Sequence, residues 1–543
     1  MVNALLDDAS THTYINEDVA AELGVQGQTQ QVSVNVLNDK QEIFDSMLID
    51  IGLESTDGSV DMNITALTTT KNDLFEILLR FRKHPVAIIC DIAEKYLQIE
   101  VAQDDRPYLR FLWRSMDLNK KPDVFEFSKV VFGLNCSPFL AQFITQEHAK
   151  SMEKELPLAA ATVEKSTYMD DNMDSVDTNS KAIELYKQLQ QLWSTAGMHA
   201  RKWVSNSVQV LQEIPEEDRL KEINIQMSEL PSVKALGLLW NAESDEFRFS
   251  FMSLKQDIKM TKRNFLKETA KLFDPLGFLG PFIIRARVLL QEMWISGVNW
   301  DETLSPGLEQ KAWSWYLEIE KLCSVKIPRG LEVSLDTSKM KLHTFVDASE
   351  AAFGAVVYLV TTREDDTKSS YLVASKCHVA PLKAVSMPRL ELLAAVLGVR
   401  LLLAITKALE LPLQRATLWS DSQNVLWWIK RQSRCFKPFV ANRIGYIQEH
   451  TNISQWKYVP SKLNAADILS RGVDAEALLT EKWLNGPEFV THDETEWPKQ
   501  TIDMDNTETS ELKKPSSQLE RKFVSGKENV LCVDDKKPNQ RIR

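Results

Sequence analysis

The chain has 543 residues, of which 44% are hydrophobic and 26% are charged. These are ordinary globular values, which exclude a mainly disordered protein, and the length allows three or four domains. No uninterrupted apolar run reaches the roughly 18 residues of a membrane span, and the first residues lack the basic start and apolar core of a signal peptide. We therefore expect no membrane association, no secretion, and a cytoplasmic or nuclear location. Six cysteines without a C-x-x-C pair predict neither a disulfide framework nor a zinc knuckle.

The net charge of −12 is unfavourable for a nucleic-acid enzyme, because contacts of Lys and Arg with phosphates supply most of the affinity. The charge is unevenly distributed along the chain. Residues 1–70 hold twelve acidic residues and one basic residue, and residues 473–543 hold fifteen and eleven, which leaves a net charge of +3 for residues 71–472. This balance permits a basic groove in the central region without proving one.

Residues 1–70 are predicted to be rich in β-strands, since residues 31–36 alternate with period two. In this segment Asp7 follows an apolar pair and precedes small residues, which resembles the D-[S/T]-G loop of retroviral-type aspartic proteases. Such proteases need two carboxylates that share a proton, one from each subunit of a homodimer. Asp8 stands here in place of the Ser or Thr, and Ala9 in place of the Gly. We therefore expect an inactive remnant of a protease.

Two acidic segments follow apolar runs in the next part of the chain. Residues 71–90 begin with an apolar helix whose apolar positions run from Leu74 to Phe81 and which Pro85 stops, and residues 86–90 predict a buried strand that ends on Asp91. Further on, residues 165–173 read KSTYMDDNM and place Asp170 and Asp171 at a turn between two strands. An acidic pair in a turn is often a solvated turn and nothing more. If the pair converges with Asp91, the carboxylates can hold two divalent metals about 3.5–4 Å apart, as phosphoryl transfer requires.

Three motifs in a fixed order resemble those of reverse transcriptases. Residues 91–99 resemble D-I-x-x-x-[F/Y]-x-Q-I, residues 132–138 resemble F-G-L-x-x-S-P, and residues 168–171 resemble the Y-x-D-D box. The resemblance implies that Asp91, Asp170 and Asp171 bind Mg²⁺ or Mn²⁺. It also implies a nucleotide pocket with an aromatic residue that excludes a ribose 2′-hydroxyl and a loop that shapes the pocket: Tyr96, and Phe132 with Gly133. For the aromatic residue, a half-buried core position is the alternative.

Two later segments extend the resemblance to a polymerase. Residues 197–203, GMHARKW, would bring Lys202 near the pyrophosphate, and a plain surface lysine is the alternative. Residues 235–240, ALGLLW, resemble the segment that holds the primer end and contain Leu236 and Gly237. Nothing like the fingers motif R-V-V-F-D-A-S precedes residue 71. We therefore expect a polymerase whose grip on the incoming triphosphate is impaired.

A second group of acidic residues lies between residues 342 and 471. The pattern predicts two strands that end on acids and two helices that carry acids in their first turn: Asp347 and Asp421, and Glu391 and Asp467. Each acid alone is more often a cap or a turn residue. Together they can hold two Mg²⁺ ions. Their order, D-A-S, R-x-E-L, S-D-S-Q and N-x-A-D, resembles that of ribonuclease H.

The motifs from about residue 4 to 498 together resemble the pol polyprotein of Pao/BEL-type LTR retrotransposons. The implied fold is a multidomain α+β and α/β chain: a retropepsin-like fragment at residues 1–70, a reverse transcriptase palm and thumb at 71–329, a ribonuclease H-like domain at 330–472, and a linker with a disordered tail at 473–543, without an integrase. The implied function is an RNA-directed DNA polymerase with ribonuclease H activity, acting on an RNA template, dNTPs and RNA–DNA hybrids. The alternative is a catalytically inactive, nucleic-acid-binding remnant of a degraded element.

Overall fold

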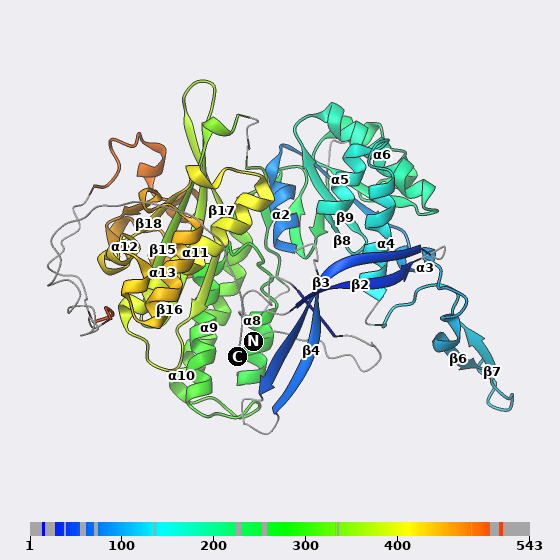
Figure 1. Cartoon of the computed structure of the whole chain (residues 1–543), viewed down its shortest axis with the longest axis horizontal. Helices are drawn as coiled ribbons and strands as arrows, with labels where there is room; N and C mark the ends of the chain where they lie inside the picture. Colours follow the sequence, from blue (N-terminus) through cyan, green and yellow to red (C-terminus); the bar gives the residue numbers. More distant parts are fainter. Residues whose placement is uncertain are drawn as a thin grey trace, which may run out of the picture.

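The computed structural model (Figure 1) describes residues 13–16, 28–36, 40–54, 61–69, 74–134, 137–223, 230–251, 258–331, 333, 336–478, 481–499 and 510–513. Its first elements are four strands: β1 (Thr13–Asn16), β2 (Gln28–Val36), β3 (Lys40–Glu54) and β4 (Asp61–Thr69). They form one sheet in the order β1-β4-β3-β2. The predicted β-rich character of this segment is confirmed. Asp7 and the rest of the predicted protease loop lie outside the described residues, so the protease remnant stays a prediction.

A second sheet, called the palm sheet below, carries the Y-M-D-D turn. It has four antiparallel strands in the order β10-β5-β9-β8: β5 (Val86–Ile92), β8 (Thr167–Tyr168), β9 (Asp171–Val176) and β10 (Ala200–Ser205). Helices α2 (Leu74–Lys83) and α6 (Asn179–Thr195) pack against it and bury the apolar run of β5. Helix α6 begins after Thr178, whose side chain accepts a hydrogen bond from the backbone N–H of Lys181. Its buried stripe of Leu185, Leu189 and Leu192 has the spacing of one helix face.

Smaller elements complete this part of the chain. They are the helices α3 (Lys95–Gln98), α4 (Ser137–Ser151), α5 (Pro157–Lys165) and α7 (Val208–Gln212), and the strands β6 (Arg110–Trp113) and β7 (Asp123–Glu126). Strands β6 and β7 form a two-stranded sheet that projects from the body of the molecule (Figure 1).

The middle of the chain joins the palm sheet to the C-terminal half. It contains a sheet in the order β11-β12-β13-β14, with β11 (Ser232–Ala235), β12 (Leu238–Asn241), β13 (Glu246–Arg248) and β14 (Lys326–Pro328). It also contains three helices: α8 (Lys262–Ala270), α9 (Gly280–Ile295) and α10 (Pro306–Glu318). The loop before α9 lies against strand β17 (Lys368–Val379), where the N–H of Ser375 donates to the carbonyl of Leu276 at 2.9 Å. A Cβ at Gly277 would lie 2.0 Å from the Ser375 carbonyl oxygen, and its φ is +75°, so only glycine fits there.

The C-terminal half is built on a five-stranded sheet. Its order is β17-β16-β15-β18-β19, with β15 (Met340–Ala348), β16 (Ala352–Thr362), β18 (Thr417–Ser420) and β19 (Trp456–Tyr458). Strands β15, β16 and β17 are antiparallel, whereas β15, β18 and β19 run parallel. Parallel neighbours need crossover connections, which are supplied by α11 (Met387–Leu409) and then by α12 (Gln423–Ile429) and α13 (Pro438–His450). Helices α14 (Asp467–Arg471), α15 (Ala475–Leu478) and α16 (Glu481–Asn485) follow the last strand.

Helix α11 corrects two expectations. It begins at Met387, so Glu391 lies in its second turn and not in the first turn, where it was expected. It is also, among the described residues, a helix long and apolar enough to cross a membrane by length and average hydropathy, although Arg400 interrupts its apolar run. In the structure 67% of its apolar stretch is buried, and the helix packs on β15 and β16 as the core helix of the sheet.

Two buried arginines join distant parts of the chain, and the first of them links α2 to the C-terminal sheet. The Arg82 guanidinium, on α2, donates hydrogen bonds to the carbonyls of Val373 at 2.6 Å and Leu372 at 2.9 Å on β17. Arg329 binds Asp245 through both carboxylate oxygens, at 2.6 and 2.8 Å, and also donates to backbone carbonyls at the end of α2 and just after it. Both side chains are almost completely buried. Helix α2 and β17 accordingly lie side by side (Figure 1).

Candidate functional site

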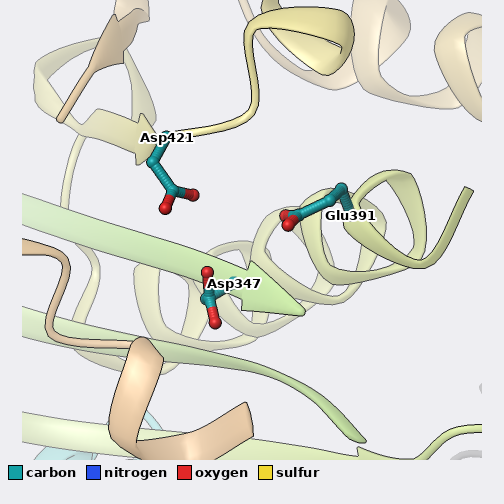
Figure 2. A group of neighbouring side chains, drawn as sticks. All are labelled: Asp347, Glu391 and Asp421. Atoms are coloured by element: carbon teal, nitrogen blue, oxygen red, sulfur yellow. The ribbon is translucent and has the colours of Figure 1, made fainter. Parts of the chain in front are cut away.

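Three carboxylates meet at one end of the five-stranded sheet. Asp347 is the penultimate residue of β15, Asp421 follows β18 directly, and Glu391 projects from α11 (Figure 2). The parallel register pairs Phe345 with Trp419, so the two strands end at the same edge and deliver their aspartates together. Ligand oxygens of the three side chains all lie within 4.8 Å of one another, a group of the kind that holds a metal ion.

Two further side chains hold these carboxylates in place. The Ser470 hydroxyl, on α14, donates to Asp347 Oδ2 at 2.5 Å. Asn464 donates through Nδ2 to Asp421 Oδ1 at 3.3 Å and to the Val346 carbonyl at 3.0 Å. Both are buried, and both lie in the segment that contains Asp467. Sequence reasoning missed these two roles, although the N-x-A-D motif contains the asparagine.

The predicted fourth ligand, Asp467, lies beside the group and not in it. It is the first residue of α14, as predicted, but its Oδ1 accepts a hydrogen bond from Arg471 Nε at 2.6 Å, one helical turn later. The negative charge of Asp467 still contributes to the raised pKa of Asp347. The structure therefore brings Asp347, Glu391 and Asp421 together and leaves Asp467 at the margin, paired with a cation.

The three carboxylates repel one another. Burial, followed by the charges of Asp421 and Asp467, raises the pKa of Asp347 to about 7, against the opposing effect of the Ser470 hydrogen bond. Burial, followed by the charges of Asp347 and Asp421, raises the pKa of Glu391 to about 9. Glu391 Oε2 is buried and has no hydrogen-bond partner. A buried carboxylate oxygen without a donor, facing two further carboxylates, fits a divalent cation, which supplies the charge that the protein side chains lack.

The palm carboxylates also come together, but in a different electrostatic setting. Asp91 on β5 pairs with Asp171 on β9 in the sheet register, and the N–H of Ile92 donates to the Asp170 carbonyl at 2.8 Å. Burial, followed by the charges of Asp170 and Asp91, raises the pKa of Asp171 to about 6. Met169 has a φ of +55°, which makes the turn tight. The predicted convergence of the three acids at one sheet end agrees with this arrangement.

Two basic side chains lie beside Asp91, where a bound metal ion is expected. Its two carboxylate oxygens lie 3.3 Å from Arg201 Nε and 3.2 Å from Lys202 Nζ. Among the described residues, the palm acids do not form a group with all ligand atoms within 4.8 Å. Lys202, predicted to approach a pyrophosphate, is an ion-pair partner of a predicted metal ligand, and its role at a pyrophosphate stays a prediction. The neighbouring Arg201 was not singled out from the sequence, although R-K next to the strand was visible.

The predicted nucleotide-pocket residues lie beside the Y-M-D-D turn. Tyr96 is buried, and its hydroxyl lies 3.8 Å from Met169 Sδ. Its ring centroid is 4.8 Å from that of Phe132, which is 69% exposed. Gly133 has a φ of +92° and open space around its Cα. A buried tyrosine that supports an exposed phenylalanine at the metal turn fits the edge of a pocket, and it also fits the alternative of a core aromatic.

The predicted primer-binding residues form a hairpin turn. Leu236 and Gly237 connect β11 to β12, with φ values of +47° and +92°. A Cβ at Gly237 would lie 2.7 Å from the Phe273 ring, so the glycine allows both the turn and the close packing of the ring.

Comparison with known families gives matches over both parts of the chain that hold these acidic residues. Residues 32–203 match the reverse transcriptase (RNA-dependent DNA polymerase) family, and residues 261–422 match the Pao retrotransposon-like RNaseH-like domain. The second match contains Asp347, Glu391 and Asp421 and ends before Asp467. The first begins inside the segment predicted to be a protease fragment. No curated protein matches the chain. The chain thus carries a reverse transcriptase domain and a Pao retrotransposon-like RNaseH-like domain, which supports its origin in the pol region of a Pao-type retrotransposon.

Proposed function

We propose that the chain is a retrotransposon-derived ribonuclease H that cleaves the RNA strand of RNA–DNA hybrids with Mg²⁺ or Mn²⁺. The observation that carries this proposal is the group of Asp347, Glu391 and Asp421, with a buried carboxylate oxygen that no protein donor satisfies. These three side chains would hold the cation, with Asp467 close by for a second ion. When bound, the metal would supply an activated water and neutralise charge on the phosphate.

The residues of the chain have separate roles in this proposal. Ser470 and Asn464 fix the orientation of two carboxylates through their hydrogen bonds. Glu391 holds a proton at neutral pH, since its pKa is raised to about 9, and releases it when a cation binds. Hybrids would be recognised by groove shape and 2′-hydroxyl contacts, so we expect little base specificity.

The polymerase half is proposed to be weak. Asp91, Asp170 and Asp171 would bind the metals, but Arg201 and Lys202 already pair with the first of them. Phosphoryl transfer relies almost entirely on positioning and charge neutralisation, and the predicted loss of the fingers motif removes part of both. The specific observation of these ion pairs favours a nucleic-acid-binding role for the palm over efficient synthesis.

The test uses the full chain, because α9 packs on β17 and α14 and a fragment of residues 330–475 would lose that support. A hybrid with a labelled RNA strand is incubated with wild-type protein over a Mg²⁺ titration. We expect metal-dependent cleavage, its loss in Asp421→Asn, and its retention in the matched surface variant Asp301→Asn, whose carboxylate is exposed and paired with Arg263.

Hybrid affinity, measured by fluorescence anisotropy, should stay within about threefold in Asp421→Asn and fall steeply with salt. A folded wild-type protein that binds hybrid and cuts nothing at any metal concentration would exclude the enzyme. In that case the alternative, a non-catalytic nucleic-acid-binding remnant, would take its place.

A further inference from the structure

A basic pocket lies at the opposite end of the five-stranded sheet from the three carboxylates. Its volume is about 460 Å³, and it is lined where β15 and β18 begin and where β16 ends. His343, on its wall, is four residues before Asp347 on β15, a separation of about 13 Å at the rise of a strand. Five cationic side chains line this basic pocket: Lys339, Lys341, Lys368, Arg415 and Lys457. Glu494 is the acidic residue among the side chains that line it.

His343 lines the basic pocket and has a buried ring nitrogen without a hydrogen-bond partner. Trp419 Nε1–H donates a hydrogen bond to His343 Nδ1 at 3.1 Å, so Nδ1 carries the lone pair. Burial, followed by the charges of Lys341 and Lys457, lowers the pKa of His343 to about 3. The ring is therefore neutral and its proton is on Nε2, which is buried and has no hydrogen-bond partner. Trp497 stands nearly perpendicular, 5.2 Å away, and offers at most a π face and no lone pair.

One carboxylate of the trailing segment partly fills the basic pocket. Glu494 contacts Lys457 Nζ and lies 3.8 Å from Lys341 Nζ. Its side chain is 57% exposed, so it can leave without breaking a buried core. A neighbouring acid, Asp493, binds Lys368 at 2.7 Å and is 82% exposed. Two exposed carboxylates thus face five cations, and the basic pocket retains a positive balance.

We propose that this basic pocket binds a phosphate group, either free or at the end of a nucleic-acid strand, which accepts the His343 N–H and displaces Glu494. A phosphate has enough oxygens to meet the imidazole and several lysines at once, whereas a single carboxylate cannot do so. The site is separate from the metal-binding carboxylates and does not depend on the proposed cleavage reaction.

The experiment is calorimetric titration of the full chain at low ionic strength. The first arm uses inorganic phosphate and pyrophosphate, and the second compares one single-stranded oligonucleotide with and without a 5′-phosphate. Binding of the free anions assigns the site to small phosphates, and a preference for the phosphorylated strand without anion binding assigns it to a strand end. No saturable binding in either arm up to about 10 mM, an affinity too weak for a built site, overturns the proposal.

Variants of residues that line the basic pocket test whether phosphate binds there. His343 itself is buried, so its replacement could unfold the protein. Lys341→Met is expected to weaken binding at least about tenfold, the value of one charge-assisted hydrogen bond. Glu494→Gln is expected to strengthen it, since the internal competitor is gone. Lys311→Met, a surface lysine paired with Glu292 on another element, is the matched control and should change nothing.

Two outcomes contradict the location. Binding that is unchanged in both Lys341→Met and Glu494→Gln does not occur in this pocket. Binding that disappears in Asp421→Asn belongs to the acidic site and its cations. Retained phosphate binding in Asp421→Asn, together with lost cleavage, would separate this proposal from that of the ribonuclease.

Discussion

Replacing Glu391 by glutamine is expected to stabilise the metal-free protein while removing its metal site. The pKa of this carboxyl group is raised from 4.5 to about 9 in the folded chain. A group with a raised folded-state pKa favours folding fully at low pH, and that contribution is lost as the pH rises from its unfolded pKa to its folded pKa. At pH 7 the unfolded chain carries the carboxylate and the folded chain carries the acid.

The magnitude follows from the interval between the unfolded pKa and the pH. From 4.5 to 7 is about 2.5 pKa units, and at 1.36 kcal/mol per unit the folded state loses about 3 kcal/mol. The loss is below about 1 kcal/mol at pH 5. Glutamine does not ionise, so Glu391→Gln avoids this penalty. For a cooperative unit of roughly 150–250 residues, the size of the C-terminal half, 1 kcal/mol corresponds to roughly 2–4 °C. The Tm of that unit in EDTA at pH 7 should therefore be about 6–12 °C higher in the variant than in wild type.

Differential scanning calorimetry in EDTA at pH 5, 7 and 8 measures this difference, with Glu292→Gln as a surface control. Added Mg²⁺ should raise the Tm of wild type and leave Glu391→Gln unchanged, because the proposed site needs the Glu391 carboxylate to hold the ion. A variant that is no more stable than wild type in EDTA, or whose advantage does not grow between pH 5 and pH 8, would refute the account of mutual repulsion in the acidic group.

Three further outcomes are expected. Ser470→Ala should weaken Mn²⁺ binding by about 10–100-fold, measured by calorimetry, because the Asp347 carboxylate loses its orienting donor; unchanged affinity would exclude this role. Gly277→Ala should lower the free energy of unfolding in urea by about 2 kcal/mol or more, since its Cβ would collide with the Ser375 carbonyl, and a loss below about 0.5 kcal/mol would contradict the packing described. Primer extension on an RNA template should be weak because cations already pair with Asp91, whereas robust synthesis abolished by Asp170→Asn would show that this pairing does not matter.

The strand ends of both sites could be predicted because their signals are local. An apolar run that ends on an acid, as at Asp91 and Asp347, is visible in a few consecutive residues, and the sheet then brings such ends together. The pairing of Asp467 with Arg471 was also within reach, since residues four apart on a helix are neighbours.

Other features depend on contacts between distant segments and left no sequence signal. The hydrogen bond from Ser470 to Asp347 joins residues 123 positions apart. The ion pair between Arg201 and Asp91 depends on the register that places these two residues opposite each other on β10 and β5, which strand propensity does not reveal. Glu391 was expected in the first turn of its helix, but α11 begins earlier, at Met387. The apolar character of α11 also continues past Arg400, because a helix can carry a cation on its exposed face.

The buried Arg82 between α2 and β17 has a consequence for how the halves of the chain would work together. Moving the palm away from the C-terminal sheet would leave the Arg82 guanidinium without the carbonyls that now solvate it, and an uncompensated buried cation is strongly unfavourable. The palm and the C-terminal sheet are therefore joined without a hinge at this point. If both acidic centres engage one duplex, the distance between them is fixed. Cuts in the RNA would then lie a constant number of base pairs from the primer end.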